Sequence, residues 1–200
     1  MGQSTEETRC SWCLGSPEYI NYHDEEWGRP VGDDVRLFEK ISLEGFQSGL
    51  SWVTVLRKRE NFRGAFQHFD PVKVARFTPI KVDELILNAG IIRHRGKIEA
   101  VVNNAMRFNE LTQAGESLAE IVWRFADPAT APDAPLVHEI ASQTPQSLAL
   151  SKELKKRGWK FVGPTTMYAF MQSMGLVNDH ATNCHSRVTC EQERASYWAH

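Results

Sequence analysis

The chain lacks the features of an exported, membrane-spanning or disulfide-bonded protein. No apolar run approaches the roughly 20 residues that cross a bilayer. The N-terminal stretch is polar and has no apolar core of a secretory signal. Four cysteines in 200 residues are too few for a disulfide scaffold. We therefore expect a cytoplasmic protein that has no membrane partner.

The chain also lacks a strong charge of either sign. Its net charge is −2, so the molecule as a whole is not a polycation. Basic residues nevertheless gather in three clusters, each beside a predicted helix boundary or a glycine turn, at 57–59, 93–97 and 152–160. One such cluster is usually a solvated helix face, but three in one chain favour contacts with phosphates.

Nor does any stretch show the sustained alternation of a β-strand, whereas apolar residues recur at helical spacing. Asp33 and Asp34 can cap a helix that runs through Phe46 and holds Glu44 near its C-terminal end. Another helix is predicted to begin at Asp70-Pro71. Further helices are predicted over 51–59, 60–69, 79–89, 96–114, 117–125, 147–157 and 164–174. The sequence therefore predicts an all-α fold.

Two stretches are predicted to lie outside the helices. Residues 127–142 hold three prolines with several Ala and Thr, which is typical of a surface loop or a connector between lobes. From His185 onward the chain is polar and has no periodic apolar face. We expect this end of the chain to be loosely held.

Possible metal ligands stand at opposite ends of the chain. Cys10 and His23 lie near the N-terminus, while His180 and Cys184 have the H-x-x-x-C spacing that puts two side chains one helical turn apart. Two thiolates and two imidazoles suit a closed tetrahedral zinc site. Free cysteines and surface histidines are the alternative. Spacing alone also leaves rival ligands open, namely Cys13, His185 and Cys190.

A glycine-containing turn joins a basic helix to an apolar one between Leu154 and Thr166. The turn contains Gly158 and Gly163, and Lys160 stands between them. Exposed backbone N–H groups and the N-terminus of the second helix can together hold a phosphate without reading sequence. An ordinary corner between two helices is the alternative.

Aromatic residues crowd the start of the chain, in a context rich in polar and turn residues: Trp12, Tyr19, Tyr22 and Trp27. Core packing is the usual fate of such residues, but this context favours a wall of rings around a planar ligand such as a flipped base. Glu44 lies near the core edge of its helix, and Trp52 follows it by eight residues. A carboxylate there could accept hydrogen bonds from an adenine amino group and attract a cationic base. A surface glutamate is the alternative.

Four strings closely resemble the 3-methyladenine DNA glycosylase I family, and they stand at 22–28, 43–52, 89–97 and 175–180. The likeness runs from about Arg9 to about Cys184. It implies a helix-hairpin-helix glycosylase fold with a zinc-binding module formed by the N- and C-terminal segments. On this basis residues 1–9 are expected to be a disordered extension, 10–184 a single two-lobed glycosylase domain, and 185–200 a polar tail.

The resemblance also implies roles for individual residues. One structural zinc is expected on Cys10, His23, His180 and Cys184, without Cys13. Glu44 is expected to read the flipped base, with Tyr22 and Trp52 as stacking walls and Trp12, Tyr19 and Trp27 nearby. The DNA-binding hairpin is expected to run from Gly158 to Gly163, with Lys160 and Thr165 at the backbone.

The expected activity is excision of 3-methyladenine from alkylated double-stranded DNA by a monomer that is associated with the nucleoid when it acts. Methylation at N3 charges the base and weakens its glycosidic bond, so the leaving group needs little acid help. No lysine is evidently placed as a Schiff-base nucleophile, so we expect a monofunctional enzyme. Asp179 stands near the position of the catalytic aspartate in many helix-hairpin-helix glycosylases and remains a secondary candidate.

Two other functions fit part of the pattern. A non-catalytic zinc-stabilised DNA-binding module would share the basic clusters and the hairpin, but it has no need of Glu44 and the aromatic wall. A zinc deaminase would require H-x-E with P-C-x-x-C, and the chain has neither motif.

Overall fold

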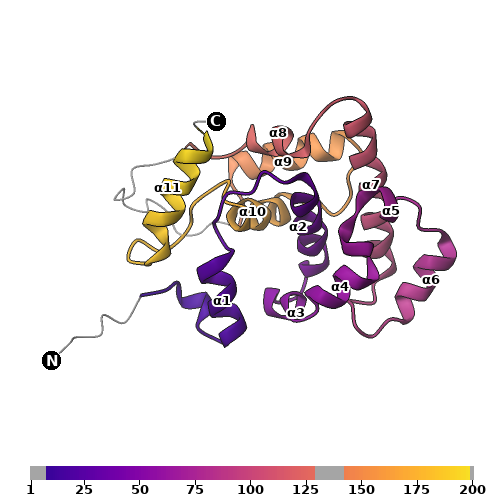
Figure 1. Cartoon of the computed structure of the whole chain (residues 1–200), viewed down its shortest axis with the longest axis horizontal. Helices are drawn as coiled ribbons and strands as arrows, with labels where there is room; N and C mark the ends of the chain where they lie inside the picture. Colours follow the sequence, from indigo (N-terminus) through magenta and orange to yellow (C-terminus); the bar gives the residue numbers. More distant parts are fainter. Residues whose placement is uncertain (1–7, 129–141, 199–200) are drawn as a thin grey trace. The chain divides into compact units, whose positions relative to one another are not determined.

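The computed structural model describes residues 8–128 and 142–198, and every regular element within these ranges is a helix (Figure 1). The all-α prediction is confirmed. Within the same ranges, no helix combines the length and the apolar character that a bilayer span requires.

The described chain divides into two compact units. The first comprises residues 8–30, 126–128, 142 and 171–198, and the second comprises residues 31–125 and 143–170.

The second unit holds most of the helices. In chain order they are α2 (Asp34–Gln47), α3 (Trp52–Leu56), α4 (Arg59–Ala65), the short 3₁₀ helix η2 (Gln67–Phe69), α5 (Pro71–Val74), α6 (Pro79–Leu87), α7 (Arg95–Gln113), α8 (Leu118–Trp123), α9 (Pro145–Lys156) and α10 (Pro164–Ser173), whose last turn belongs to the first unit.

Side-chain caps explain where several of these helices begin. The carboxylate of Asp33 accepts a hydrogen bond from the Arg36 amide at 2.8 Å and starts α2, as predicted. Thr144 and Ser147 form a reciprocal capping box, so α9 begins at Pro145 and not at 147 as predicted.

A core of fully buried aromatic rings holds α2 to its neighbours. Phe46 packs against Phe62 at 4.5 Å between ring centroids, and Phe66 stacks on Phe69 at 5.5 Å. The ammonium of Lys97 on α7 donates to the carbonyls of Phe46 and Ser48, at 2.9 and 2.6 Å. These contacts cap the C-terminal end of α2, which is the helix that carries Glu44.

The first unit contains η1 (Ser11–Cys13), α1 (Pro17–Glu25) and α11 (Ser186–Trp198). The sequence analysis did not predict α1. The sequence at its start is nevertheless a standard signal for a helix N-terminus. The Ser16 hydroxyl accepts from the Tyr19 amide, and Pro17 occupies the first helical position.

The prediction of a loosely held tail from His185 onward is wrong for residues 186–198. These residues form α11, and its inward face is built from Arg187, Glu191 and Arg194 at helical spacing, with Cys190 beside them. Arg194 is 1% exposed and bonds the Glu191 carboxylate at 2.9 Å. It also donates to the carbonyl of Gly175 at 2.8 Å. A polar face gives no hydrophobic periodicity, although it is buried here with its hydrogen bonds satisfied.

Two predicted irregular segments fall partly outside the described residues. Of the extension 1–9, residues 1–7 lie outside, while Thr8 accepts a hydrogen bond from the His185 amide at 2.9 Å and Arg9 pairs with Asp24 at 2.9 Å. Thr8 and Arg9 are therefore ordered by contacts, contrary to the prediction. Of the connector 127–142, residues 129–141 lie outside.

Candidate functional site

Four possible metal ligands gather in the first unit. The ligand atoms of Cys10, His23, His180 and Cys184 all lie within 4.8 Å of one another, and all four residues are buried. Cys10 precedes η1 and His23 belongs to α1. His180 and Cys184 lie in the non-helical segment before α11, where the chain turns, so the predicted helical placement of this pair is wrong.

The distances fit a tetrahedral zinc ion. The Cys184 sulfur lies 3.4 Å from Nε2 of His23 and 3.4 Å from Nδ1 of His180, and the Cys10 sulfur lies 3.7 Å from the same Nδ1. A tetrahedral zinc with ordinary bond lengths separates a sulfur from a nitrogen by about 3.5 Å. The four side chains thus stand where such an ion needs them.

The outward nitrogen of each histidine has a partner of its own. Nδ1 of His23 donates to the Asp24 carboxylate at 2.7 Å, and Nε2 of His180 donates to the Trp27 carbonyl at 3.1 Å. Each bond fixes the tautomer and directs the other ring nitrogen, with its lone pair, at the cluster. Histidines that ligate metals are usually held in this way.

Asp24 is kept ionised by its neighbours. Burial raises the pKa of this carboxyl, but hydrogen bonds from Arg9, His23 and His185 outweigh burial and lower the pKa to about 2. His185 is thus a partner of Asp24, at 3.1 Å, and not one of the four clustered ligands.

The two clustered thiols shift each other's pKa in opposite directions. A hydrogen bond from the Cys10 thiol lowers the pKa of Cys184, while the same contact raises the pKa of Cys10. One thiolate is therefore already favoured in the cluster, and a thiolate is the form of cysteine that binds a metal.

The remaining cysteines lie outside the cluster. The Cys13 thiol donates to the carbonyl of Cys10 at 3.0 Å. The Cys190 sulfur lies 3.4 Å from Nε2 of His180, which is the ring nitrogen turned away from the cluster. Neither position allows coordination together with the other four ligands.

Gly28 gives a test of how tightly the cluster is held. It has a φ of +83°, and a Cβ there would lie 2.7 Å from Nε2 of His180. We expect Gly28→Ala to displace this ring and lower both zinc content and melting temperature, since left-handed strain of about 1–3 kcal/mol adds to the clash. Metal analysis and calorimetry measure the two effects.

Gly115→Ala is the matched control, because Gly115 has a φ of +77° and nothing within 4 Å of its added Cβ. It should lose some stability and keep its metal. Equal zinc content in both variants would contradict the contact with His180.

The predicted aromatic wall lies beside this cluster. Trp12 makes edge contacts with Tyr19, Tyr22 and Trp27 at 5.4, 6.4 and 5.0 Å between ring centroids. The Trp27 ring also lies edge-on to His180 at 4.6 Å. Trp27 therefore packs against His180 of this cluster, and this packing accounts for the burial of its ring.

Glu44 and Trp52 belong to the second unit, on α2 and α3. Glu44 is only 4% exposed, which excludes the alternative of a surface glutamate. Its carboxylate pairs with Lys40 at 2.9 Å, and the Lys40 ammonium lies 3.3 Å from the centroid of a Trp52 ring. The sequence analysis missed Lys40, although its spacing of four residues from Glu44 on one helix is a signal for such a pair. The joint use of Tyr22 and Trp52 on one base stays a prediction, since these residues belong to different units.

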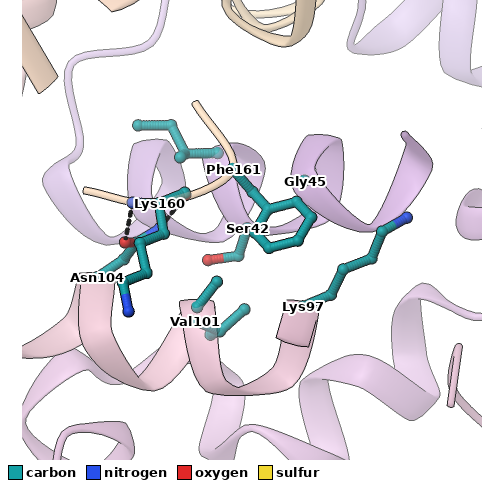
Figure 2. Close-up of a pocket in the computed structure, with 9 residues that line it drawn as sticks. Ser42, Gly45, Lys97, Val101, Asn104, Lys160 and Phe161 are labelled. Atoms are coloured by element: carbon teal, nitrogen blue, oxygen red, sulfur yellow. Dashed lines mark hydrogen bonds between the residues drawn. The ribbon is translucent and has the colours of Figure 1, made fainter. Parts of the chain in front are cut away.

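The glycine-containing connection between α9 and α10 is braced from α7 (Figure 2). The Asn104 side chain accepts from the Lys160 amide at 2.8 Å and donates to the Lys160 carbonyl at 2.9 Å, as the dashed lines show. Asn103 donates to the Gly158 carbonyl at 2.9 Å. Gly158 and Phe161 have positive φ, at +82° and +56°. The side chains of Lys160 and Thr165 are exposed, as a phosphate contact requires.

Several residues of the basic clusters have structural partners. Lys58 donates to the Ala89 carbonyl at 3.0 Å, Lys97 caps α2, and Arg157 pairs with Glu116 at 2.7 Å. These residues stabilise helix ends and contacts, and fewer basic side chains remain for phosphates than the three clusters suggested. The secondary candidate Asp179 is buried in the first unit and accepts a hydrogen bond from Gln172 at 2.9 Å.

Comparison with known proteins extends over nearly the whole chain. Residues 12–187 match the family model described as methyladenine glycosylase. The chain is 52% identical over 177 residues to DNA-3-methyladenine glycosylase 1 of Escherichia coli (strain K12), which covers 88% of this chain and 95% of that protein.

Solved structures agree. A crystal structure of a 3-methyladenine DNA glycosylase I has a TM-score of 0.85 and 52% identity, and the match covers 89% of this chain and 98% of the other. A variant of such an enzyme in complex with 3-methyladenine has a TM-score of 0.81 and 35% identity, over 90% of this chain and 97% of the other.

Proposed function

The chain belongs to the methyladenine glycosylase family, and from this premise we propose that it flips 3-methyladenine out of alkylated DNA and releases it without cutting the strand. Its activity is that of a DNA-3-methyladenine glycosylase, a hydrolase of N-glycosyl bonds. The observation that carries the proposal is the buried Glu44 carboxylate, linked to the Trp52 ring through the Lys40 ammonium, in a chain this similar to named glycosylases.

Glu44 and Trp52 suit the charge of the lesion. Adenine methylated at N3 is cationic as long as it is attached to the sugar, and its glycosidic bond is already weak. A carboxylate attracts this cation and can accept hydrogen bonds from the exocyclic amino group. The face of a tryptophan adds a cation–π attraction of about 0.5–2 kcal/mol. Unmodified adenine has no such charge and resists unpairing, so extrusion itself contributes to selectivity.

Hydrolysis then needs little from the protein beyond position and charge. As the N-glycosidic bond breaks, its electron pair passes to the base and positive charge develops on the sugar. The negative charge of Glu44 stabilises that developing cation. Water supplies the hydroxyl at the sugar carbon and loses a proton. No covalent intermediate with a lysine is required, which is why we propose a monofunctional enzyme.

The metal cluster has a separate, structural role in the proposal. Cys10, His23, His180 and Cys184 would hold one zinc ion, which when bound links the N-terminal segment to the segment before α11. All four ligands come from the protein and fill a tetrahedral shell, so no position is left for water or substrate.

Release of free 3-methyladenine from methylated duplex DNA is the deciding experiment. Chromatography of the supernatant should show the free base, and the DNA strand should stay intact until the abasic sites are cleaved by alkali. Strand cleavage without alkali would contradict the monofunctional assignment. Binding without release of any base would favour the non-catalytic DNA-binding module.

Lys160 tests the proposed hairpin contact with DNA. Its side chain is exposed, while the Asn104 side chain hydrogen-bonds both the amide and the carbonyl of Lys160. The ammonium can therefore be removed without disturbing the turn. We expect Lys160→Ala to weaken binding to all sequences alike and to lower the slope of log K against log salt by about one. Titrations at several salt concentrations measure this slope.

Lys73→Ala is the control for that measurement, since Lys73 on α5 is also exposed but pairs with Asp70. It should leave the slope unchanged. A changed sequence preference in Lys160→Ala, with the slope intact, would contradict a phosphate contact.

A further inference from the structure

Lys40 contacts Glu44 and Trp52, the two side chains that the proposed function assigns to the cationic base. It is one helical turn before Glu44 on α2, and the two charged atoms are 2.9 Å apart. The same ammonium lies 3.3 Å from the centroid of a Trp52 ring. Both charged side chains are almost fully buried, at 7% and 4% exposure. A positive charge therefore already contacts the carboxylate and the aromatic ring.

These two contacts are the ones that a methylated base would make. An ion pair with Glu44 and a cation–π contact with Trp52 both require a cation, and neither requires it to be part of a base. A buried carboxylate without a partner is strongly unfavourable. In the absence of substrate, Lys40 supplies that partner.

We propose that Lys40 is an exchangeable counter-ion, which the cationic base displaces from Glu44 and Trp52 and which returns once the base has lost its charge. This inference rests on the proposed function. The exchange follows the charge balance of hydrolysis. The base enters as a cation, the electron pair of the broken N-glycosidic bond neutralises it, and water completes the sugar. The released base is then a neutral ligand in competition with an ammonium.

Two properties follow for the reaction. A neutral base replaces the Lys40 ion pair poorly, so Lys40 selects against undamaged adenine at the level of charge. The neutral product is also held weakly, because the returning ammonium regains a charge-assisted contact that the product cannot match. Lys40 is thus a specificity residue that also favours product release.

Affinity for free 3-methyladenine in slightly alkaline buffer tests the exchange, because the free base is neutral there. Calorimetric titration of the zinc-loaded protein gives the dissociation constant without any need for turnover. We expect Lys40→Met to bind the free base at least about tenfold more tightly than the wild type, since no ion pair has to be broken. Lys40→Gln should act in the same direction. It replaces the methionine variant if that variant fails to fold, because the glutamine amide can still donate to Glu44.

Two further variants separate charge from packing. Lys40→Arg keeps the positive charge and should retain the affinity of the wild type. Lys81→Met removes a lysine from an exposed pair with Glu84 on α6, so it should also retain that affinity. Weaker or unchanged binding of the free base by both Lys40→Met and Lys40→Gln would overturn the exchange and leave Lys40 as a structural partner of Glu44.

The outcome is distinguishable from failure of the proposed function itself. If the wild type releases no 3-methyladenine from methylated DNA, the proposed function fails and the inference falls with it. If the wild type releases the base but the neutral variants do not bind it more tightly, only the exchange at Lys40 is wrong.

Discussion

Cys184→Ser is expected to lose bound zinc and to melt at a markedly lower temperature, whereas Cys13→Ser keeps both its metal and its stability. The Cys184 sulfur lies 3.4 Å from a ring nitrogen of His23 and of His180, while the Cys13 thiol donates to the backbone carbonyl of Cys10. A hydroxyl is a poor zinc ligand in place of a thiolate. A structural zinc contributes its binding free energy to folding, so we expect a loss above about 4 kcal/mol.

The size of this effect follows from what the zinc would connect. The ligands come from positions 10, 23, 180 and 184, so the metal would close a loop of most of the chain. Metal analysis after gentle purification, together with calorimetry, measures both consequences. Less than half an equivalent of zinc in the wild type would contradict the site, and loss of zinc from Cys13→Ser would show that the ligands are wrongly assigned.

The spacing of cysteines and histidines predicted a possible metal site but not its full set of ligands. The types and positions of Cys10, His23, His180 and Cys184 suggested a tetrahedral site, but spacing could not separate Cys10 from Cys13. The family resemblance made that choice, and the structure brings the four together. It also shows why spacing misled for the late pair, because the chain turns between His180 and Cys184 where a helix was predicted.

Helices with an apolar stripe were predictable, and helices that bury polar residues were not. The apolar residues of α2 recur at helical spacing, so its start and length agree with the prediction. In α11 the buried positions are filled by Arg187, Glu191 and Arg194. The two arginines donate to the carbonyls of His180 and Gly175, outside the helix, and Glu191 accepts from the Asn178 amide group. No local pattern reveals such partners, because they exist only once the chain has folded.

The residues that support the candidate site were also beyond the sequence analysis. Asn104 braces the connection between α9 and α10 from α7, and Lys40 contacts Glu44 and Trp52. Asparagine in a helix carries no signal for a partner 56 residues away. Lys40 did carry one, its spacing to Glu44, but surface pairs at that spacing are common and contribute little. Only burial distinguishes this pair from them.

Glu44→Gln is expected to slow the release of 3-methyladenine by about one to two decades, because a lost charge-assisted hydrogen bond costs roughly 1.5–3 kcal/mol. The substitution keeps the size of the side chain. It removes the negative charge that attracts the cationic base, and it replaces one acceptor oxygen by a donor that opposes the adenine amino group. Binding to undamaged DNA should stay near that of the wild type, since the turn that we propose to contact DNA, from Gly158 to Gly163, is untouched.

The fold should survive this change with a modest loss of stability. Lys40 loses its ionic partner, but the amide oxygen introduced by Glu44→Gln can still accept a hydrogen bond, and the contact with Trp52 remains.

Glu39→Gln is the matched control, because Glu39 lies on the same helix and pairs with Arg63 at 2.8 Å. It should lose comparable stability and keep its rate. Single-turnover release followed by chromatography separates the two variants. A correctly folded Glu44→Gln that releases the base at the rate of the wild type would remove Glu44 from the site. Equal slowing in both variants would assign the effect to α2 as a whole.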